Sequence, residues 1–529
     1  MNVRLATTGL ATAMALVLST PTYAETPADT LVIADVIDDV LSLDPHEVSE
    51  VGGVLVTTQV YQNLVTVNID DATDIQPQLA ESWEISEDGL TYTFTMDPDA
   101  TFSSGNPVTA EDAAWSLQRA VKLNSRSAFI ITQFGFTPEN VEERVRVEDG
   151  KLVVTIEEAY SPSFFLVVLS AYVAAIVERA PLVENEVDGD FGNAWLKSGE
   201  ASVGSGPFTL SQWDPAVAIV MERNENYWGD APEMARVVIR HVAESATQRL
   251  LLEQGDIDIA NKLAPDDHQA MADNADVTTI TGDSSVIYYM GMNQRTEPLD
   301  QPEVIEAMKW LIDYQGMADS LARGTVSVHQ TMIPGGFLGE SEYTPYSYDL
   351  DRANELLAEA GVDLPIELDI VVWNNAPYVD FAQALQATMA PAGIDLNLEV
   401  VDGGQWLERY RSHDLDGWMG LWGPDYPDPH SNARAFAVTA ADTPDDKETL
   451  ADRFGFDPGD LSPRTMEALA ETDTAARAAL YEAIQVEHTD TSPFLFMFQE
   501  QRAIGVRENV EGLVLGVTFA DDRYWNVTK

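Results

Sequence analysis

Apolar and polar positions alternate along the chain in patterns that predict strands and helices. Residues 90–96 alternate apolar and polar side chains, with Tyr and Phe among them, which predicts a half-buried strand. Thr109 precedes a predicted helix, and Asp112 stands three residues later as in a capping box. Residues 145–157 predict two strands around a Glu-Asp-Gly turn, and residues 56–65 favour a helix.

The second half of the chain alternates strands with helices. Residues 366–373 and 394–401 predict strands, and residues 378–390 predict the helix between them. Another helix is expected over residues 349–360, with apolar side chains on one face and Gly361 as its end. This alternation of strand, helix and strand implies an α/β fold with a parallel sheet and helices outside it.

The first 24 residues have the features of a secretory signal. Arg4 supplies the positive charge, residues 5–18 are mostly apolar, and the small residues at Thr22 and Ala24 predict cleavage after Ala24. The apolar run is shorter than the roughly 20 residues that a membrane-spanning helix needs, which argues against an anchor. The chain has no Cys, so it cannot carry the lipid of a lipoprotein. We therefore expect free release into the periplasm.

Size and charge narrow the class of protein further. The chain has 529 residues, more than one core usually supports, so two or three lobes are expected. Its net charge is −59, from 88 acidic and 29 basic residues, yet 45% of its residues are hydrophobic, which excludes a disordered acidic tail. Such an acidic surface suits a saline, halophilic habitat and repels nucleic acid.

Ten segments resemble, in the expected order, the family 5 extracellular solute-binding proteins of peptide and nickel importers. The longest is LAESWEISEDGLTYTFTMDPDATFSSGNPVTAEDAAWSL at residues 79–117. The other nine are LDPH at 43, VYQNLV at 60, GSGPF at 204, RNENYWGDAP at 223, EQGDIDIA at 253, YYMGMN at 288, EVIEAMKWLIDYQGMA at 303, YSYDLDRANELLAEAG at 346 and GWMGLWGPDYPDPH at 417. Each segment alone is only moderately specific, whereas the ordered series covers most of the chain.

The resemblance implies a bilobed periplasmic binding protein clamshell of the class with an extra inserted domain, built from mixed sheets flanked by helices. The implied boundaries are residues 1–24 for the signal peptide, 25–68 with 203–289 and 503–529 for lobe I, 69–202 for the inserted domain II, and 290–502 for lobe III. Two crossing strands would form a hinge, so that the lobes close around a ligand.

The resemblance also implies a function. A member of this family is a receptor of an ABC importer, which captures a small peptide or another polar solute and delivers it to the permease subunits. We expect a monomer that needs no cofactor and catalyses no reaction. A nickel chelate, an opine or an oligosaccharide is the alternative ligand within the same class of receptor.

The best candidate for the ligand site is the segment of residues 421–436. Its three prolines exclude a regular helix, which predicts a rigid loop after a strand, where α/β sheets bind ligands. By the resemblance, Asp425 occupies the position that pairs with a peptide's α-ammonium; alternatively, it caps a turn. The aromatic residues Trp422, Tyr426, Trp418 and Trp373 are candidates for the pocket wall, with ordinary core packing as the alternative.

A peptide also needs a partner for its carboxylate, and the sequence does not select one. Arg409, Arg411 and Arg434 all lie near the candidate loop. Gly52, in the segment VSEVGG of residues 48–53, is a candidate contact from the first lobe because glycine permits close approach; a simple turn is the alternative.

The sequence shows no clear motif of the common enzyme classes. None of the seven His residues shows the H-x-x-x-H spacing of a helical zinc site, although Asp425, Asp428 and His430 lie close enough in sequence to hold a divalent ion. There is no G-x-S-x-G, no thiol nucleophile and no marked pair of glycosidase carboxylates. GSGP lacks the Lys-Ser/Thr of a phosphate loop. A secreted hydrolase is therefore a remote alternative.

Overall fold

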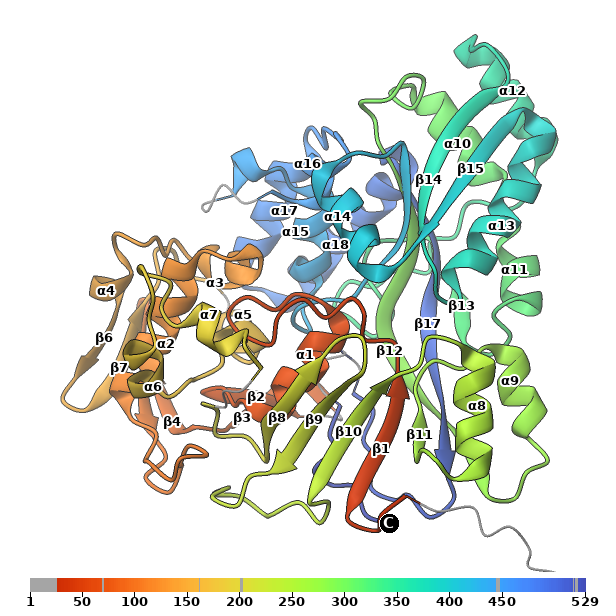
Figure 1. Cartoon of the computed structure of the whole chain (residues 1–529). Helices are drawn as coiled ribbons and strands as arrows, with labels where there is room; N and C mark the ends of the chain where they lie inside the picture. Colours follow the sequence, from red (N-terminus) through yellow and green to blue (C-terminus); the bar gives the residue numbers. More distant parts are fainter. Residues whose placement is uncertain are drawn as a thin grey trace, which may run out of the picture.

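The structure is a computed structural model of the chain, which describes residues 26–68, 71–160, 162–199, 203–443, 448–516, 518 and 522–529. The predicted signal peptide, residues 1–24, lies outside these residues. Figure 1 shows two long strands, β12 and β17, running through the middle of the molecule. Within the described ranges, no helix is both long enough and apolar enough to span a membrane.

One large mixed sheet organises the described residues. Ten of its eleven strands follow the order β15-β14-β16-β12-β17-β11-β1-β10-β9-β8, and the eleventh, β13, pairs with β17 off this path. The strands are β1 (Thr30–Asp35), β8 (Phe208–Asp214), β9 (Ala218–Arg223), β10 (Arg236–His241), β11 (Ile259–Ala260), β12 (Val277–Met292), β13 (Val326–Val328), β14 (Ile366–Trp373), β15 (Ile394–Val401), β16 (Gly417–Trp422) and β17 (Phe494–Arg507). Because β11 lies between β1 and β17, the sheet brings segments near both ends of the chain together.

The antiparallel strands β12 and β17 connect the two parts of this sheet. They are 16 and 14 residues long, and they pair from Val277 opposite Arg507 to Gly291 opposite Phe494. Their register shifts between Asp283 and Ile287, and such an irregularity bends and twists a strand locally. The boundaries expected at residues 289/290 and 502/503 both fall within these two strands.

On one side of β12, the predicted alternation of strands and helices forms a parallel layer. β14 pairs in parallel with β15 and with β16. Helix α13 (Tyr378–Met389) connects β14 to β15, α14 (Gly403–Ser412) connects β15 to β16, and α12 (Leu350–Ala360) precedes β14. Asp349 caps α12 by accepting the Arg352 N–H, and Gly361 ends it with a φ of 68°. Parallel strands require such crossover helices, which is why the pattern was readable in the sequence.

Residues 65–199 form two smaller sheets. An antiparallel sheet has the order β4-β5-β7-β6, and β2 pairs with β3. The strands are β2 (Val65–Asn68), β3 (Asp71–Pro77), β4 (Ala80–Ile85), β5 (Thr91–Met96), β6 (Val145–Glu148) and β7 (Lys151–Thr155). The predicted capping box is present, since Thr109 and Asp112 each accept the other's backbone N–H at the start of α2 (Ala110–Leu123). The predicted hairpin is present as well, with Asp149 and Gly150 at positive φ between β6 and β7.

The helix expected over residues 56–65 lies closer to the N-terminus than predicted. α1 covers Val51–Val60, and Tyr61 already has extended backbone angles. Gln62 then forms a β-bridge with Ile176, and β2 begins at Val65. A short apolar run is compatible with either a strand or a helix, so periodicity alone misplaced this end.

The remaining helices include several that pack on the large sheet. They are α3 (Phe129–Thr132), α4 (Val141–Arg144), α5 (Pro162–Leu169), α6 (Arg179–Glu184), α7 (Asn193–Leu196), α8 (Ser245–Gln254), α9 (Pro265–Met271), α10 (Pro302–Trp310), α11 (Tyr314–Ser320), α15 (Pro429–Ala437), α16 (Leu450–Arg453), α17 (Leu461–Ala470) and α18 (Thr474–Thr491). The largest buried cluster packs α10, α12, α13, α15 and α18 against the strands β12, β14, β16 and β17.

Candidate binding cavity

A cavity of about 460 Å³ lies between segments that are far apart in sequence. Its walls come from the loop of residues 36–50 with the start of α1, from the short helix η1 (Arg126–Ala128), from the middle of β12 and β17, and from the ends of β14 and β16 with α14 and α15. This volume is typical of a pocket for a small molecule.

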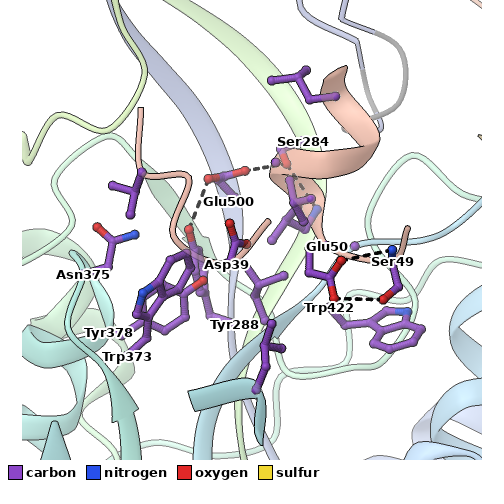
Figure 2. A pocket seen from close by; sticks show the side chains of 18 of the residues that line it. Asp39, Ser49, Glu50, Ser284, Tyr288, Trp373, Asn375, Tyr378, Trp422 and Glu500 are labelled. Atoms are coloured by element: carbon purple, nitrogen blue, oxygen red, sulfur yellow. Dashed lines mark hydrogen bonds between the residues drawn. The ribbon is translucent and has the colours of Figure 1, made fainter. Parts of the chain in front are cut away.

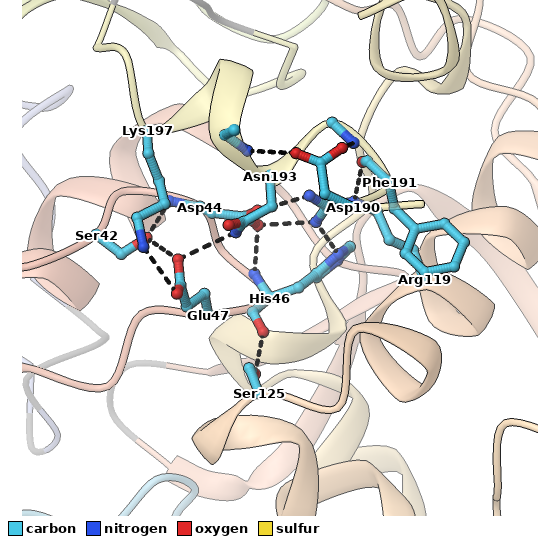
Figure 3. A network of polar contacts seen from close by, with 12 residues as sticks. Ser42, Asp44, His46, Glu47, Arg119, Ser125, Asp190, Phe191, Asn193 and Lys197 are labelled. Carbon is cyan, nitrogen blue, oxygen red and sulfur yellow. Dashed lines mark hydrogen bonds and ion pairs between the residues drawn. The ribbon is translucent and has the colours of Figure 1, made fainter. Parts of the chain in front are cut away.

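Arg119 on α2 anchors the loop of residues 36–50 (Figure 3). Its guanidinium donates to both carboxylate oxygens of Asp44, at 2.8 and 2.6 Å, and to His46 Nδ1 at 2.8 Å. His46 Nε2 lies 2.9 Å from the Ala175 carbonyl oxygen, to which it donates. Burial opposes the ionisation of Asp44, but the charge and hydrogen bonds of Arg119 outweigh it and lower the pKa of Asp44 to about 2. The part of the loop around Asp44 and His46 is therefore held in place by buried hydrogen bonds.

Asp425 lies in the bend after β16 and lines the cavity, where it had been predicted to meet the ligand. Its backbone N–H donates to Ser431 Oγ at 2.9 Å, and its Oδ1 accepts from the Tyr172 hydroxyl at 2.9 Å. Its Oδ2 is buried and has no hydrogen-bond partner among the described residues. Burial raises the pKa of Asp425 to about 6, although Tyr172 and the charge of Arg434 lower it. One oxygen of this carboxylate is thus held in place while the other lacks a donor.

Asp428, three residues further on, has a different environment. It caps α15 by accepting the His430 N–H, and both its oxygens accept from the Arg477 guanidinium, at 2.8 and 2.7 Å. Asp428 is therefore occupied by the fold. In the described ranges no group of three His, Asp or Glu side chains is arranged to hold a metal ion, and the trio of Asp425, Asp428 and His430 forms no such group.

Aromatic rings form one wall of the cavity. Trp373, Trp406, Trp418 and Tyr410 stack in a row, with ring centroids 5.2, 4.4 and 4.2 Å apart and planes within 22° of parallel. Trp422 also lines the cavity, and its indole N–H is buried without a partner among the described residues. The structure thus brings the three predicted tryptophans, Trp373, Trp418 and Trp422, to one cavity.

Tyr426 does not line the cavity. Its ring is 1% exposed and packs edge-on against Phe164, with centroids 6.0 Å apart, in the core around the smaller antiparallel sheet. Gln133 Nε2 lies 3.5 Å from its hydroxyl. Because Asp425 faces the cavity, the next side chain along the bend points into the core behind it. Tyr426 is therefore not part of the described cavity wall.

Gly52 lines the cavity at the start of α1, and its close neighbours are protein groups. A Cβ at this position would lie 3.1 Å from Val40 Cγ2 and 3.4 Å from Asp39 Oδ1. The neighbouring Gly53 is more crowded, because a Cβ there would lie 2.5 Å from Val48 Cγ2. The glycine pair allows α1 to pack closely on the loop of residues 36–50.

The three candidate arginines for a ligand carboxylate have different surroundings. Arg409 pairs with Glu399 at 2.5 Å and does not line the cavity. Arg411 lines the cavity but pairs with the buried Glu50 at 2.5 Å. Arg434 also lines the cavity, is 3% exposed, and has its guanidinium carbon 4.6 Å from the centre of the Phe129 ring.

Arg126 on η1 is a cavity residue that the sequence did not single out. It is exposed toward the cavity and makes no hydrogen bond or ion pair with any described residue. Burial and the nearby charges of Arg411 and Arg453 lower its pKa. Its position on a three-residue helix carries no periodic signal that sequence reading would detect.

Asp39 is a second cavity residue that sequence reading missed. Figure 2 shows Asp39 with Glu500 and the aromatic rings of Tyr288, Tyr378 and Trp373 on the cavity wall. Glu500 accepts hydrogen bonds from the hydroxyls of Ser284 and Tyr288, at 2.8 and 3.1 Å. Asp39 accepts none from any described residue. With 88 acidic residues in the chain, nothing in the sequence distinguishes this one.

Sequence comparisons with known proteins point to one family. The model of the bacterial extracellular solute-binding proteins, family 5 Middle, matches residues 74–443. The probable D,D-dipeptide-binding periplasmic protein DdpA of Escherichia coli (strain K12) is 30% identical over 512 residues, covering 95% of each chain. The nickel-binding periplasmic protein of the same organism is 27% identical over 465 residues, covering 83% of each chain.

Solved structures share the fold. DppA from Helicobacter pylori, a periplasmic binding protein in complex with the peptide STSA, has a TM-score of 0.81 at 23% identity, covering 94% of this chain and 98% of that one. NikZ from Campylobacter jejuni, in complex with Ni(L-His), has a TM-score of 0.80 at 20% identity, covering 95% and 100%. The fold is therefore the bilobed α/β fold of periplasmic binding proteins, and the chain belongs to family 5 of the bacterial extracellular solute-binding proteins.

Proposed function

We propose that the chain is a periplasmic receptor of an ABC importer, which captures a small peptide or peptide-like solute in the cavity and delivers it unaltered to permease subunits. Family membership supports the receptor role, and the dipeptide-binding protein of Escherichia coli and DdpA are among its relatives. One observation carries the peptide assignment: the same cavity contains a carboxylate oxygen of Asp425 and the guanidinium of Arg126, neither with a partner among the described residues.

Asp425 is the proposed partner of the peptide's α-ammonium. An ammonium donates charged hydrogen bonds, and the Oδ2 of Asp425 is a buried acceptor that lacks a donor. The Tyr172 hydroxyl fixes the other oxygen at 2.9 Å, so the carboxylate is oriented before the ligand arrives. A charged group that enters this position replaces part of the hydration that the buried carboxylate has lost.

Arg126 is the proposed partner of the peptide's carboxylate. A guanidinium matches a carboxylate with two parallel hydrogen bonds, and that of Arg126 is unoccupied within the described residues. Arg411 and Arg453 add positive charge nearby, although each already pairs with an acid, Glu50 and Glu448 respectively. The two ends of a short peptide would then be recognised by opposite charges within one cavity.

The aromatic wall gives the peptide's side chains an apolar surface. The rings of Trp373, Trp418 and Trp422 provide large contact areas with little loss of conformational entropy. Such contacts discriminate weakly among apolar side chains, which suits a receptor for a class of peptides.

One rival ligand, an oligosaccharide, fits this arrangement less well than a peptide. An oligosaccharide site relies on stacked rings and neutral hydrogen bonders, whereas this cavity has ionisable groups at its walls. A nickel chelate and an opine remain the competing ligands of the same receptor class, since relatives in complex with Ni(L-His) and with agropinic acid share the fold. A secreted hydrolase is the remote alternative.

We also propose the expected division of the chain into lobe I (residues 25–68, 203–289 and 503–529), domain II (69–202) and lobe III (290–502), with β12 and β17 as the hinge. The proposed mature protein starts after Ala24, carries no lipid, and acts as a monomer with an acidic surface. Its net charge becomes −60, because the signal peptide contains Arg4 and no acid, so that −59 − 1 = −60. Intact mass measurement and light scattering test the cleavage site and the monomer.

The peptide assignment is tested by calorimetry with free and end-blocked peptides. We expect Ala-Leu to bind, and N-acetylation or C-amidation to lower its affinity at least tenfold each, because each removes one charge. Ni(L-His), agropinic acid and a trisaccharide serve as competing ligands. Equal binding of blocked and free peptides, tighter binding of a competitor, or recovery of cleaved peptide by mass spectrometry would contradict the proposal.

A further inference from the structure

Asp39 is a buried carboxylate on the cavity wall that has no hydrogen-bond or ion-pair partner among the residues that the structure describes. It is 7% exposed and lines the cavity from the loop after β1. Its Oδ1 is buried, and neither oxygen accepts a hydrogen bond or forms an ion pair with any described residue. Lys262 is close enough for its charge to favour the ionised form, yet it makes no ion pair with Asp39. Buried polar groups in folded proteins nearly always have partners, so this exception needs an explanation.

The surroundings of Asp39 favour a cation. Glu50, Asp38 and Asp35 lie near it, and burial together with their charges raises the pKa of Asp39 to about 8. A positive group placed there would displace the proton of Asp39 and offset the charges of Asp39, Asp38 and Asp35, none of which forms an ion pair with a described residue, whereas Glu50 already pairs with Arg411. An anion or a neutral group would supply no counter-charge to an ionised Asp39.

Aromatic rings beside Asp39 suit the stem of a basic side chain. A Cβ built on Gly403 would lie 3.2 Å from Asp39 Cβ and 3.1 Å from Trp373 Nε1, which places the Trp373 ring next to Asp39. The Tyr378 ring lies tilted to that of Trp373, with the centroids 5.3 Å apart, and Figure 2 shows both rings beside Asp39. Lys and Arg side chains lay their methylene stems on such rings and present their charged ends to a carboxylate.

Asp39 and Asp425 offer two different anionic positions. Asp425 lies after β16, contacts Tyr172 and faces the charge of Arg434. Asp39 lies after β1, among Glu50, Asp38 and Asp35. A peptide with a neutral side chain has one ammonium and therefore satisfies only one of the two carboxylates.

We propose that Asp39 is a second cation subsite, which makes the receptor selective for peptides with a basic side chain. The inference rests on the proposed peptide-binding function and adds the ligand's chemical class to it. The α-ammonium binds Asp425, the carboxylate binds Arg126, and the ammonium or guanidinium of the side chain binds Asp39.

Calorimetry on the full mature chain tests this subsite with matched peptides. Ala-Lys and Ala-Arg are compared with Ala-norleucine, and Lys-Ala with norleucine-Ala, so that length stays similar while the charge changes. We expect at least one basic peptide to bind tenfold or more tightly than its neutral match. Asp39→Asn should abolish that preference and leave the affinity for the neutral peptides unchanged or higher.

Asp35→Asn is the matched control. Asp35 lines the same cavity, but its two oxygens accept from the Val36 N–H and from Asn261 Nδ2, at 2.7 and 2.8 Å. Among the three acids near Asp39 its charge has the smallest influence, so Asp35→Asn should retain the preference for basic peptides. Equal affinities within every matched pair, or a preference that survives Asp39→Asn, would overturn the subsite while leaving peptide binding intact.

A further arm separates the two proposals. Agmatine and cadaverine carry cationic ends without a peptide bond or a carboxylate. If no peptide binds but these amines bind in a manner that Asp39→Asn removes, the peptide function is wrong and the cation subsite is supported. If neither peptides nor amines bind, both proposals are overturned. A thermal melt of each variant shows that it is folded.

Discussion

Two buried aspartates of one loop, Asp39 and Asp44, differ in their partners more than in their burial. Asp44 is fully buried and accepts hydrogen bonds from Arg119 and from Asn193, the latter at 2.9 Å. Asp39 accepts none within the described residues. The pKa of Asp44 is accordingly lowered to about 2, whereas that of Asp39 is raised to about 8. A fully partnered carboxylate stabilises the fold, and an unpartnered one at a cavity wall is available to a ligand.

The same contrast recurs in the bend after β16. Asp428 accepts two hydrogen bonds from Arg477, while Asp425 leaves one oxygen without a donor. In each pair, the aspartate bound by an arginine lies three to five residues from the one that has an oxygen without a donor among the described residues, and it holds the segment that carries both. Arg119 and Arg477 thus hold the two loops in place through Asp44 and Asp428, whereas Asp39 and Asp425 line the cavity.

The largest expected effect on stability comes from removing the arginine that pairs with Asp44. Arg119→Leu leaves Asp44 buried without its cation, so we expect the free energy of unfolding to fall by on the order of 3–5 kcal/mol. Urea denaturation followed by Trp fluorescence measures it. Lys122→Ala on the same helix is the control, because Lys122 pairs with an exposed Glu142, and we expect a change of about 0.5 kcal/mol or less. A loss below about 1 kcal/mol for Arg119→Leu would refute a stabilising role for the pair.

The next effect separates Asp425 from Asp428. Asp425→Asn should lower the affinity for a free peptide by on the order of 3 kcal/mol, roughly 100-fold, because the ammonium loses its charged partner. Its unfolding free energy should not fall. Asp428→Asn should instead destabilise the protein, since it leaves Arg477 buried with a weaker partner. Calorimetry and urea denaturation of both variants give the two readouts, and an Asp425→Asn variant with undiminished affinity contradicts the ammonium site.

Asp39→Asn should raise the stability of the protein, whereas Arg119→Leu and Asp428→Asn should lower it. Its pKa is about 8 in the folded protein and 3.8 in a solvated chain, so between these values the folded state binds the extra proton. Stability contributed by protonated Asp39 is therefore lost as the pH rises from about 4 to about 8. Asp39→Asn should remove this slope and gain on the order of 2 kcal/mol at pH 8 relative to the parent. Urea denaturation from pH 5 to pH 8 measures the difference, and parallel curves for variant and parent would show that Asp39 does not titrate as described.

Local patterns in the sequence predicted much of the fold. Three predicted features depend on residues that are close in sequence: the capping box at Thr109, the turn at Asp149-Gly150, and the parallel pair β14 and β15. The helix at residues 56–65 was misplaced because Gln62 pairs with Ile176, more than a hundred positions away. A long-range pairing of this kind leaves no periodic trace.

The sequence singled out part of the candidate site. The family resemblance pointed to Asp425, and the suitability of aromatic residues for a pocket wall suggested Trp373, Trp418 and Trp422; all four line the cavity. Asp39 and Arg126 are distinguished by having no hydrogen-bond or ion-pair partner among the described residues. This property depends on the tertiary structure and cannot be read from the sequence. Tyr426 shows the reverse case, since Trp422 at the cavity and Tyr426 in the core are aromatic residues of the same segment, and the sequence does not tell them apart.

The smallest effect extends the comparison from acids to bases. Arg126 lacks a partner among the described residues, whereas Arg409 pairs with Glu399 outside the cavity. Arg126→Ala should weaken binding of a free peptide by about 1–2 kcal/mol, because a charged hydrogen bond to the ligand is lost, and Arg409→Ala should leave the affinity unchanged. An amidated peptide has no carboxylate for Arg126, so the Arg126→Ala variant should bind it as tightly as the parent does. Calorimetry of both peptides with both variants completes the cycle, and an equal loss for the amidated peptide would place Arg126 outside the carboxylate site.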